Sequence, residues 1–141
     1  MPAWGIVPNG PAEISLYYSQ NYDHPTSRLR RAKLRTDGFV SVHAGYSGGE
    51  FVTRPIVFDG TKLIVNYATS AVGSVKVEIQ DVAGMPRNGY TISDSRELYG
   101  DEIESIIEWK DGHDLDPFRG KPVRLKFVMK DADVYSIQFR S

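Results

Sequence analysis

The chain has 141 residues, with 17 basic and 18 acidic side chains, a formal net charge of -1 and no cysteine. The length is typical of one domain, so we expect a single domain over residues 1–141. The absence of a basic excess argues against nucleic acid or a membrane surface as partner, and the lack of cysteine excludes disulfides and thiolate chemistry.

The N-terminal third brings aromatic rings and cations together. Trp4, Tyr17, Tyr18 and Tyr22 precede residues 27–35, which hold five cations in nine residues. Exposed rings stack on the apolar face of a sugar or under a cation, and arginine forks bind carboxylate, sulfate or phosphate through paired hydrogen bonds. The alternative is structural: some rings belong to a core, and the cations are solvated on an exposed strand.

Two Asp-Gly pairs predict hairpins, because such turns accept positive φ at low energetic cost. Asp37-Gly38 separates residues 28–35 from 39–44, and Asp59-Gly60 separates 51–58 from 62–68. In the alternation of residues 39–44, His43 shares a face with Phe39 and is expected either to have its hydrogen bonds satisfied or to lie at a strand edge. Tyr46 follows in a glycine-rich loop tip, a common place for ligand contact.

Further strands are expected over residues 62–68 and 75–80, joined by a five-residue link at 69–73. Two shorter strands are expected at 89–92 and 103–109, with a single helical turn between them at 94–99. Alternation with Ile107 places Trp109 in the core. The acidic loop that follows, with Asp111, Asp114 and Asp116, has ligands that suit calcium, although a solvated loop with turn-forming aspartates is the simpler explanation.

The clearest alternation covers residues 123–139, where apolar and polar side chains take turns on both sides of Asp131-Ala132-Asp133. A period of two is typical of a strand with one buried and one wet face, so we expect a closing hairpin here. Eight to ten short strands without a convincing helix predict an all-β protein. We expect an antiparallel β-sandwich, with jelly-roll (concanavalin-like) topology.

Catalytic signatures are missing from the sequence. His24, His43 and His113 lie in unrelated segments, and there is no nucleophile elbow, phosphate-binding loop or zincin helix. Among eighteen acidic residues some pair would fit glycoside hydrolysis by chance, so carboxylate pairs predict nothing. We therefore expect no enzymatic activity.

Several phrases resemble a known class of bacterial module. They are Tyr17-Tyr18 with Tyr22, Ser27 to Arg31, Leu34 to Phe39, Gly48-Gly49 before Thr53-Arg54-Pro55, Val77 to Asp81, Gly100-Asp101, and Gly120 to Ser136 with its central Asp131-Ala132-Asp133. Together they resemble the C-terminal β-sandwich that follows a five-bladed propeller in proteins like the glycoside hydrolases of families 32 and 43. Catalytic acids of such enzymes lie on the propeller, so the resemblance implies an accessory module without catalytic residues.

The resulting hypothesis is a non-catalytic carbohydrate-binding module of a polysaccharide-active enzyme, with polysaccharide or oligosaccharide as ligand. The expected ligand contacts are Tyr17, Tyr22, Arg28, Arg30, Arg31, His43, Tyr46 and Arg54. The alternative is a structural sandwich whose aromatic face, including Trp4, docks on the catalytic domain of a parent glycoside hydrolase or on a second copy. Either role implies part of a longer bacterial protein that is secreted or periplasmic, with no cofactor except calcium.

Overall fold

The computed structural model describes residues 5–112 and 114–141, so Trp4 and His113 lie outside the described residues. The described chain forms eight strands, with every strand pairing antiparallel, and one 3₁₀ turn. The all-β, antiparallel prediction is confirmed. The chain divides into two compact units, residues 1–40 (unit 1) and 41–141 (unit 2).

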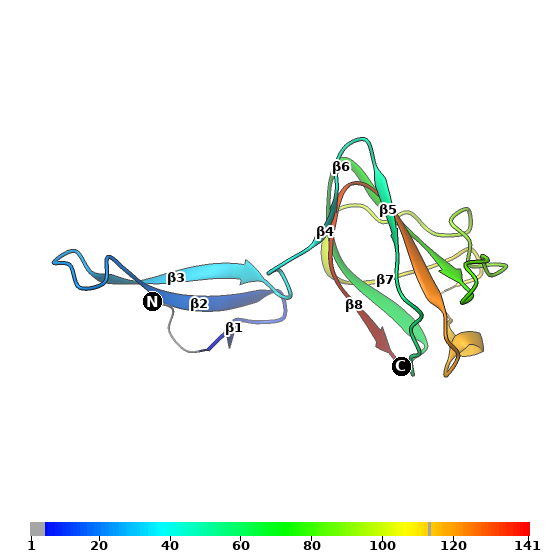
Figure 1. Ribbon diagram of the computed structural model, residues 1–141, viewed down its shortest axis with the longest axis horizontal. Coiled ribbons are helices and arrows are strands. Elements are labelled where there is room, and N and C mark those ends of the chain that lie inside the picture. The colour runs from blue at the N-terminus through cyan, green and yellow to red at the C-terminus, as the bar shows by residue number, and fades with distance from the viewer. Residues whose placement is uncertain (1–4, 113) are drawn as a thin grey trace. The chain divides into compact units, whose positions relative to one another are not determined.

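Unit 1 is a three-stranded sheet in the order β1-β2-β3, formed by β1 (Val7–Pro8), β2 (Glu13–Gln20) and β3 (Arg28–Arg35) (Figure 1). Register places Ile14 opposite Leu34 and Leu16 opposite Ala32. These pairs share one face of the sheet, which is apolar at this end of the ladder and carries Arg28 and Arg30 at the other end.

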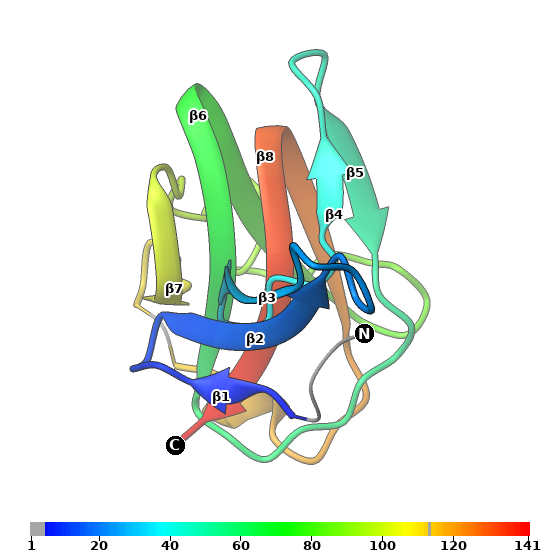
Figure 2. The same cartoon turned by 90° about the vertical axis from the view of Figure 1, so that its left-hand side faces the viewer.

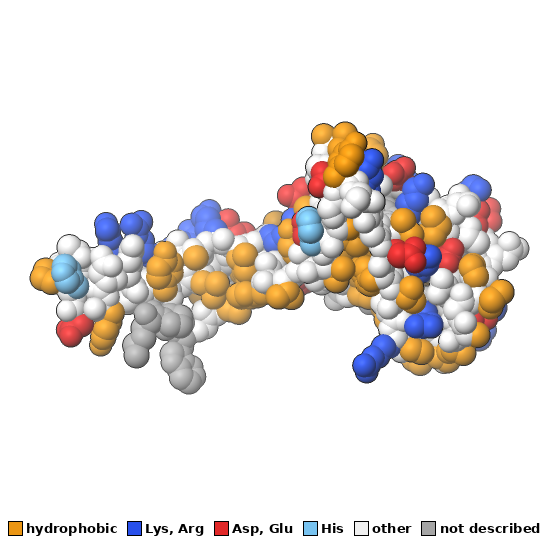
Figure 3. Space-filling view, turned by 45° about the horizontal axis from the view of Figure 1, so that its top comes forward, with side chains coloured by type: hydrophobic (Ala, Val, Ile, Leu, Met, Phe, Trp, Pro, Cys, Tyr) orange, Lys and Arg blue, Asp and Glu red, His pale blue; other side chains and the backbone are white. Residues whose placement is uncertain are grey.

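The opposite face of unit 1 is polar. It carries Glu13, Ser15, Arg31 and Lys33, and Ser15 is the one buried residue among the described positions up to residue 40. Side chains of the apolar face are half-buried or exposed, as Tyr18 with 41% of its surface exposed illustrates. Unit 1 therefore presents an amphipathic sheet without a core of its own. Figure 3 shows blue cationic side chains along one rim of this sheet and orange hydrophobic ones beside them.

Unit 2 is a five-stranded sheet built on two long neighbouring strands, β6 (Lys62–Gln80) and β8 (Arg124–Arg140). The edge strand β7 (Asp101–Ile106) pairs with β6, while β4 (Val42–Ala44) and β5 (Gly49–Val52) pair with the far edge of β8. Figure 2 shows β6 and β8 side by side, with β4 and β5 beyond β8.

Both long strands bend at the same level, where their register shifts between Thr69 and Ser74. In Figure 1 each strand folds over at this point, so its two halves face one another. Gly73 makes the bend possible, because a Cβ there would meet the backbone oxygens of Asp131 and Lys130. The halves enclose the core of the molecule.

That core contains alternate residues of both strands. On β6 they are Leu63, Val65, Tyr67, Val75, Val77 and Ile79, and on β8 they are Leu125, Phe127, Met129, Ala132 and Val134. Trp109 is 4% exposed, which confirms its predicted place in the core. Its indole Nε1–H donates to the carbonyl of Val77 at 2.9 Å, so its polar atom is also satisfied.

Both Asp-Gly hairpin predictions are wrong. Asp37 and Gly38 form a tight turn, with Asp37 at φ 58°, but β3 pairs with β2 and β4 pairs with β8. Residues 51–58 do not pair with 62–68 either, because β5 joins β8. The dipeptide favours a turn, and long-range pairing decided which strands lie side by side.

The predicted breaks within the long strands coincide with the bend, where the β6–β8 register shifts, but neither of them ends a strand. The link at residues 69–73 lies inside β6, and the turn at 131–133 lies inside β8, where Asp131 adopts φ 41° and Ala132 is buried. Residues 89–92 form no strand, the 94–99 segment forms no helical turn, and the 3₁₀ turn lies instead at Asp116–Phe118. No helix within the described ranges has the length and apolar character needed to span a bilayer.

Candidate functional site

Five of the eight predicted ligand contacts lie on unit 1. Tyr22 is 71% exposed beyond the end of β2, while Tyr17 is half-buried on the polar face opposite Arg31. Arg28 and Arg30 lie on the other face, opposite Gln20 and Tyr18. The predicted contacts on unit 1 therefore divide between two faces and a loop, and do not converge on one point.

Two of the three arginines predicted as contacts on unit 1 form side-chain hydrogen bonds within the sheet. The guanidinium of Arg31 donates to Ser15 Oγ at 3.0 Å and to Glu13 Oε1 at 3.0 Å. Arg30 Nε donates to Gln20 Oε1 at 2.8 Å. These contacts hold the side chains across the β2–β3 ladder, so ligand binding would compete with them.

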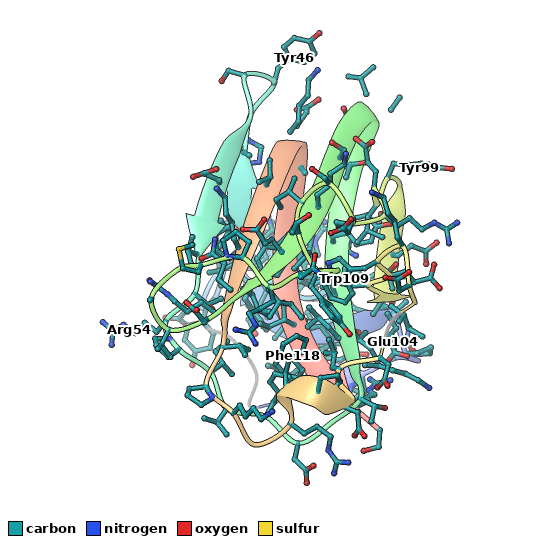
Figure 4. All side chains as sticks on the ribbon, turned by 90° about the vertical axis from the view of Figure 1, so that its right-hand side faces the viewer. Tyr46, Arg54, Tyr99, Glu104, Trp109 and Phe118 are labelled. Carbon is teal, nitrogen blue, oxygen red and sulfur yellow. The ribbon has the colours of Figure 1, made fainter. Side chains whose placement is uncertain are left out.

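The other three predicted contacts lie on unit 2. Tyr46 is 69% exposed at the tip between β4 and β5, with Lys130 Nζ 4.5 Å from its ring centroid. Arg54 is exposed after β5, and Figure 4 shows both side chains pointing outward in different directions. His43 is exposed, and its Nδ1 lies 3.1 Å from Asp133 Oδ1, as expected for a satisfied histidine at the sheet surface.

Ser41, His43 and Asp133 gather at this point without the order that acyl transfer requires. The Ser41 hydroxyl donates to Asp133 Oδ1 at 2.6 Å, the same oxygen that His43 contacts. A serine nucleophile instead needs the histidine between itself and the carboxylate. This trio is a hydrogen-bonded clamp on β4 and β8.

The acidic loop shows no assembled calcium site. Asp116 pairs with Arg119 at 3.1 Å, and Asp114 Oδ1 accepts the backbone N–H of Asp116 at 2.9 Å. Within residues 5–112 and 114–141, no three His, Cys, Asp or Glu side chains come together as metal ligands would. The calcium site at Asp111, Asp114 and Asp116 stays a prediction.

Unit 2 contains a hollow that the sequence did not indicate, which we name the Arg87 hollow. It has a volume of about 480 Å³ and is lined by Pro86, Arg87, Asn88, Tyr90, Pro117, Phe118 and Lys121. Its aromatic side belongs to the core, because the Tyr90 ring lies 4.8 Å from Phe118 and 5.1 Å from Trp109. Figure 4 shows Trp109 and Phe118 within unit 2.

Both walls of the Arg87 hollow are fixed by hydrogen bonds. The Arg87 N–H donates to the Ile79 carbonyl at 2.8 Å, and the Ile79 N–H donates to the Tyr90 carbonyl at 2.9 Å. Across the hollow, the Tyr90 hydroxyl donates to the Asp114 carbonyl at 2.7 Å. The loop of residues 81–90 is thus tied both to β6 and to the segment before the 3₁₀ turn, so its geometry is preorganised.

A second hollow in unit 2, the Tyr99 hollow, has the opposite charge. Its volume is about 470 Å³, and its lining includes Tyr99 together with Glu97, Glu102, Glu104, Glu108 and Arg96. Arg96 pairs with Glu108 at 2.5 Å, and Glu104 pairs with Arg140 at 2.6 Å. Tyr99 is 76% exposed, and Figure 4 shows it on the same side of unit 2 as Glu104.

The Arg87 hollow escaped sequence reasoning because its walls lie about thirty positions apart in the chain and come from two loops. One local signal was present: Arg87 and Asn88 stand beside Tyr90 in a Gly- and Pro-containing loop. Comparison of the chain with family models, with curated proteins and with solved structures gave no match.

Proposed function

We propose that this chain is a non-catalytic carbohydrate-binding module of a polysaccharide-active enzyme, with jelly-roll topology, and that saccharide binds in the Arg87 hollow. One observation carries the proposal: a core-anchored aromatic floor meets an arginine, an amide and a lysine at one rigid hollow. Secretion or export as part of a longer protein accords with this role.

The chemistry of the Arg87 hollow suits a hydroxyl-rich ring. Tyr90 and Phe118 supply an apolar surface for the C–H face of a sugar, while Arg87, Asn88 and Lys121 supply hydrogen-bond donors, and the Asn88 amide also accepts. Because the walls are already fixed, little ordering accompanies binding. We expect affinities between micromolar and millimolar, since the contact area is small and the competing water binds well.

The test is affinity electrophoresis and calorimetry of the full chain against a panel of neutral and acidic polysaccharides. Arg87→Ala is expected to weaken binding about tenfold, the value of one good charged hydrogen bond. Arg96→Ala, an exposed arginine at the Tyr99 hollow, is the matched control and should bind like the parent.

Two further variants represent the sequence-based hypothesis, Tyr46→Ala and Arg30→Ala. If these two variants abolish binding while Arg87→Ala retains it, the chain is still a carbohydrate-binding module. The saccharide then binds at the residues predicted from the sequence and not in the Arg87 hollow. If no polysaccharide is retained by the parent chain, the carbohydrate-binding proposal is wrong.

A second candidate function rests on unit 1. Within unit 1 nothing covers the apolar part of one sheet face, where Ile14, Leu16 and Leu34 are half-buried, and Ile6 is 50% exposed. A three-stranded sheet with an uncovered apolar face gains stability by packing on another layer. This observation favours the structural alternative, docking on the catalytic domain of a parent glycoside hydrolase or on a second copy.

Light scattering of the isolated chain distinguishes the two possible docking partners, a second copy and a catalytic domain. A concentration-dependent dimer that Leu16→Lys disperses supports self-association. A monomer at every concentration leaves the catalytic domain as the docking partner, and a monomer that also fails to bind that domain in trans refutes docking.

A further inference from the structure

We propose that the Arg87 hollow selects saccharides that bear an anionic group, a uronate carboxylate or a sulfate ester, over their neutral counterparts. The inference rests on the proposed function and narrows its ligand class. Both anions present negatively charged oxygens that an arginine and a lysine recognise, so the shared chemistry is the charged oxygen group.

The charge of the lining carries the inference. Two cations, Arg87 and Lys121, line the hollow, and none of the described residues that line it is a carboxylate. Within the described chain neither cation forms an ion pair, whereas neighbouring Arg119 is paired with both Asp59 and Asp116. The hollow therefore holds positive charge that the surrounding structure does not neutralise.

Lys121 is held through its side chain, and Arg87 through its backbone. Lys121 Nζ donates to the Pro117 carbonyl at 2.9 Å, which anchors the ammonium and leaves two of its three protons for a ligand. The Arg87 carbonyl accepts the Tyr90 N–H at 3.0 Å, and the Arg87 N–H is bonded to β6. The Arg87 side chain therefore extends from a fixed backbone position. Its guanidinium can form two parallel hydrogen bonds with a carboxylate or a sulfate.

Acidic groups near Tyr90 do not cancel this charge within the hollow. Burial, and then the charges of Asp114 and Asp111, raise the pKa of the Tyr90 hydroxyl, so the phenol stays neutral at physiological pH. Neither aspartate lines the hollow. The Asp111 carboxylate lies next to Gly89, beside the lining residues Asn88 and Tyr90, whereas both cations are among the residues that line the space a ligand enters.

The Tyr99 hollow provides a built-in contrast. It is of nearly equal volume, but four glutamates line it against one arginine. Three of these glutamates, Glu97, Glu104 and Glu108, are paired with Lys76, Arg140 and Arg96, and an acidic excess remains. An anionic saccharide is repelled there, because like charges in a partly desolvated site are unfavourable. Size does not distinguish the two sites, so charge decides which hollow accepts an anion.

The experiment compares three ligands of matched length on the full chain: a galacturonate oligomer, a sulfated galactan oligomer and the neutral galactan oligomer. Calorimetry at low salt should show at least one acidic ligand bound about tenfold more tightly than the neutral one. The advantage should shrink at about 0.5 M salt, where screening is strong. The acidic ligand that gains affinity identifies the group, carboxylate or sulfate.

Variants locate the effect. Arg87→Ala and Lys121→Ala should each remove most of the preference for acid, while Arg87→Lys should retain part of it and Arg96→Ala all of it. Circular dichroism of each variant confirms an intact fold, and because all these side chains lie at the surface we expect no loss of structure.

The outcomes separate the two proposals. Equal binding of neutral and acidic ligands that depends on Arg87 overturns the charge selection and leaves the module intact. Acidic binding that Arg87→Ala and Lys121→Ala do not change also overturns it, because the anion then binds elsewhere. If none of the three oligomers nor any polysaccharide of the wider panel binds, the proposed function itself fails.

Discussion

Unit 1 and unit 2 use the same alternation of apolar and polar residues to different ends. In unit 2, β6 and β8 fold over and bury their apolar faces against each other's halves, so Leu63, Val65 and Phe127 have no exposed surface. In unit 1, β2 and β3 put Leu16 and Leu34 on one face, and nothing within that unit covers it. Alternation therefore sets which face is apolar, while strand length and bending determine whether the chain can cover that face itself.

The largest expected difference between the units is the effect of removing a leucine side chain from the core. Leu125 on β8 is 1% exposed, and Leu125→Ala should lower the free energy of unfolding by about 2–5 kcal/mol, through lost burial and a cavity. Urea unfolding followed by circular dichroism measures this loss. A change below about 1 kcal/mol would mean that the core relaxes around the gap and is looser than its burial indicates.

The same substitution in unit 1 is the matched test. Leu34→Ala removes a half-buried side chain opposite Ile14, and should destabilise the β2–β3 pairing by less than about 1 kcal/mol, because part of its surface is already in water. Hydrogen exchange of the β2 and β3 amides measures the effect locally. A loss as large as that of Leu125→Ala would show that another layer covers this face in solution, which would favour the docking candidate.

The comparison also explains how much of the fold the sequence could predict. The faces of the later half of β6 and of the first half of β8 follow directly from alternation, and the burial of Trp109 followed from its spacing to Ile107. The continuity of β6 and β8 did not, because a residue with positive φ such as Asp131 looks like a turn in sequence. In the structure a matching irregularity in the neighbouring strand absorbs it, and that coincidence depends on pairing across more than fifty positions.

The candidate site was less predictable than the fold. Sequence reasoning selected aromatic and cationic residues that are near one another in the chain, such as Tyr22 and Arg28, and the structure spreads these over separate surfaces. The Arg87 hollow depends instead on the Tyr90 hydrogen bond to Asp114 and on ring packing with Phe118. Contacts between two loops of this kind have no periodic signature, so they appear only once the chain is folded.

The smallest predicted effect is a loss of stability at acidic pH, and unit 1 should lose stability before unit 2. Hydrogen bonds from Asn9 and Lys33, and then the charges of Lys33 and Arg31, lower the pKa of Glu13 below its usual 4.5. A carboxylate with a lowered folded-state pKa stabilises the fold above about pH 4.5, and this contribution is lost as the pH falls through the folded value. The protection factors of the β2 and β3 amides, which are corrected for the pH dependence of intrinsic exchange, should therefore fall below that pH.

Unit 2 provides the reference for this measurement. Asp94 there also has a lowered pKa, through its hydrogen bonds with Thr91 and Lys110, but the packed core keeps the surrounding strands closed when one surface carboxylate is protonated. The protection factors of the β6 and β8 amides should therefore change little over the same range. Glu13→Gln should remove most of the acid response of unit 1, because it deletes the titrating group while keeping a hydrogen-bond acceptor for Asn9. If the amides of β2 and β6 lose protection together as the pH falls, the two units unfold as one. That result would contradict the expectation that the sheet of unit 1 is less stable than the core of unit 2.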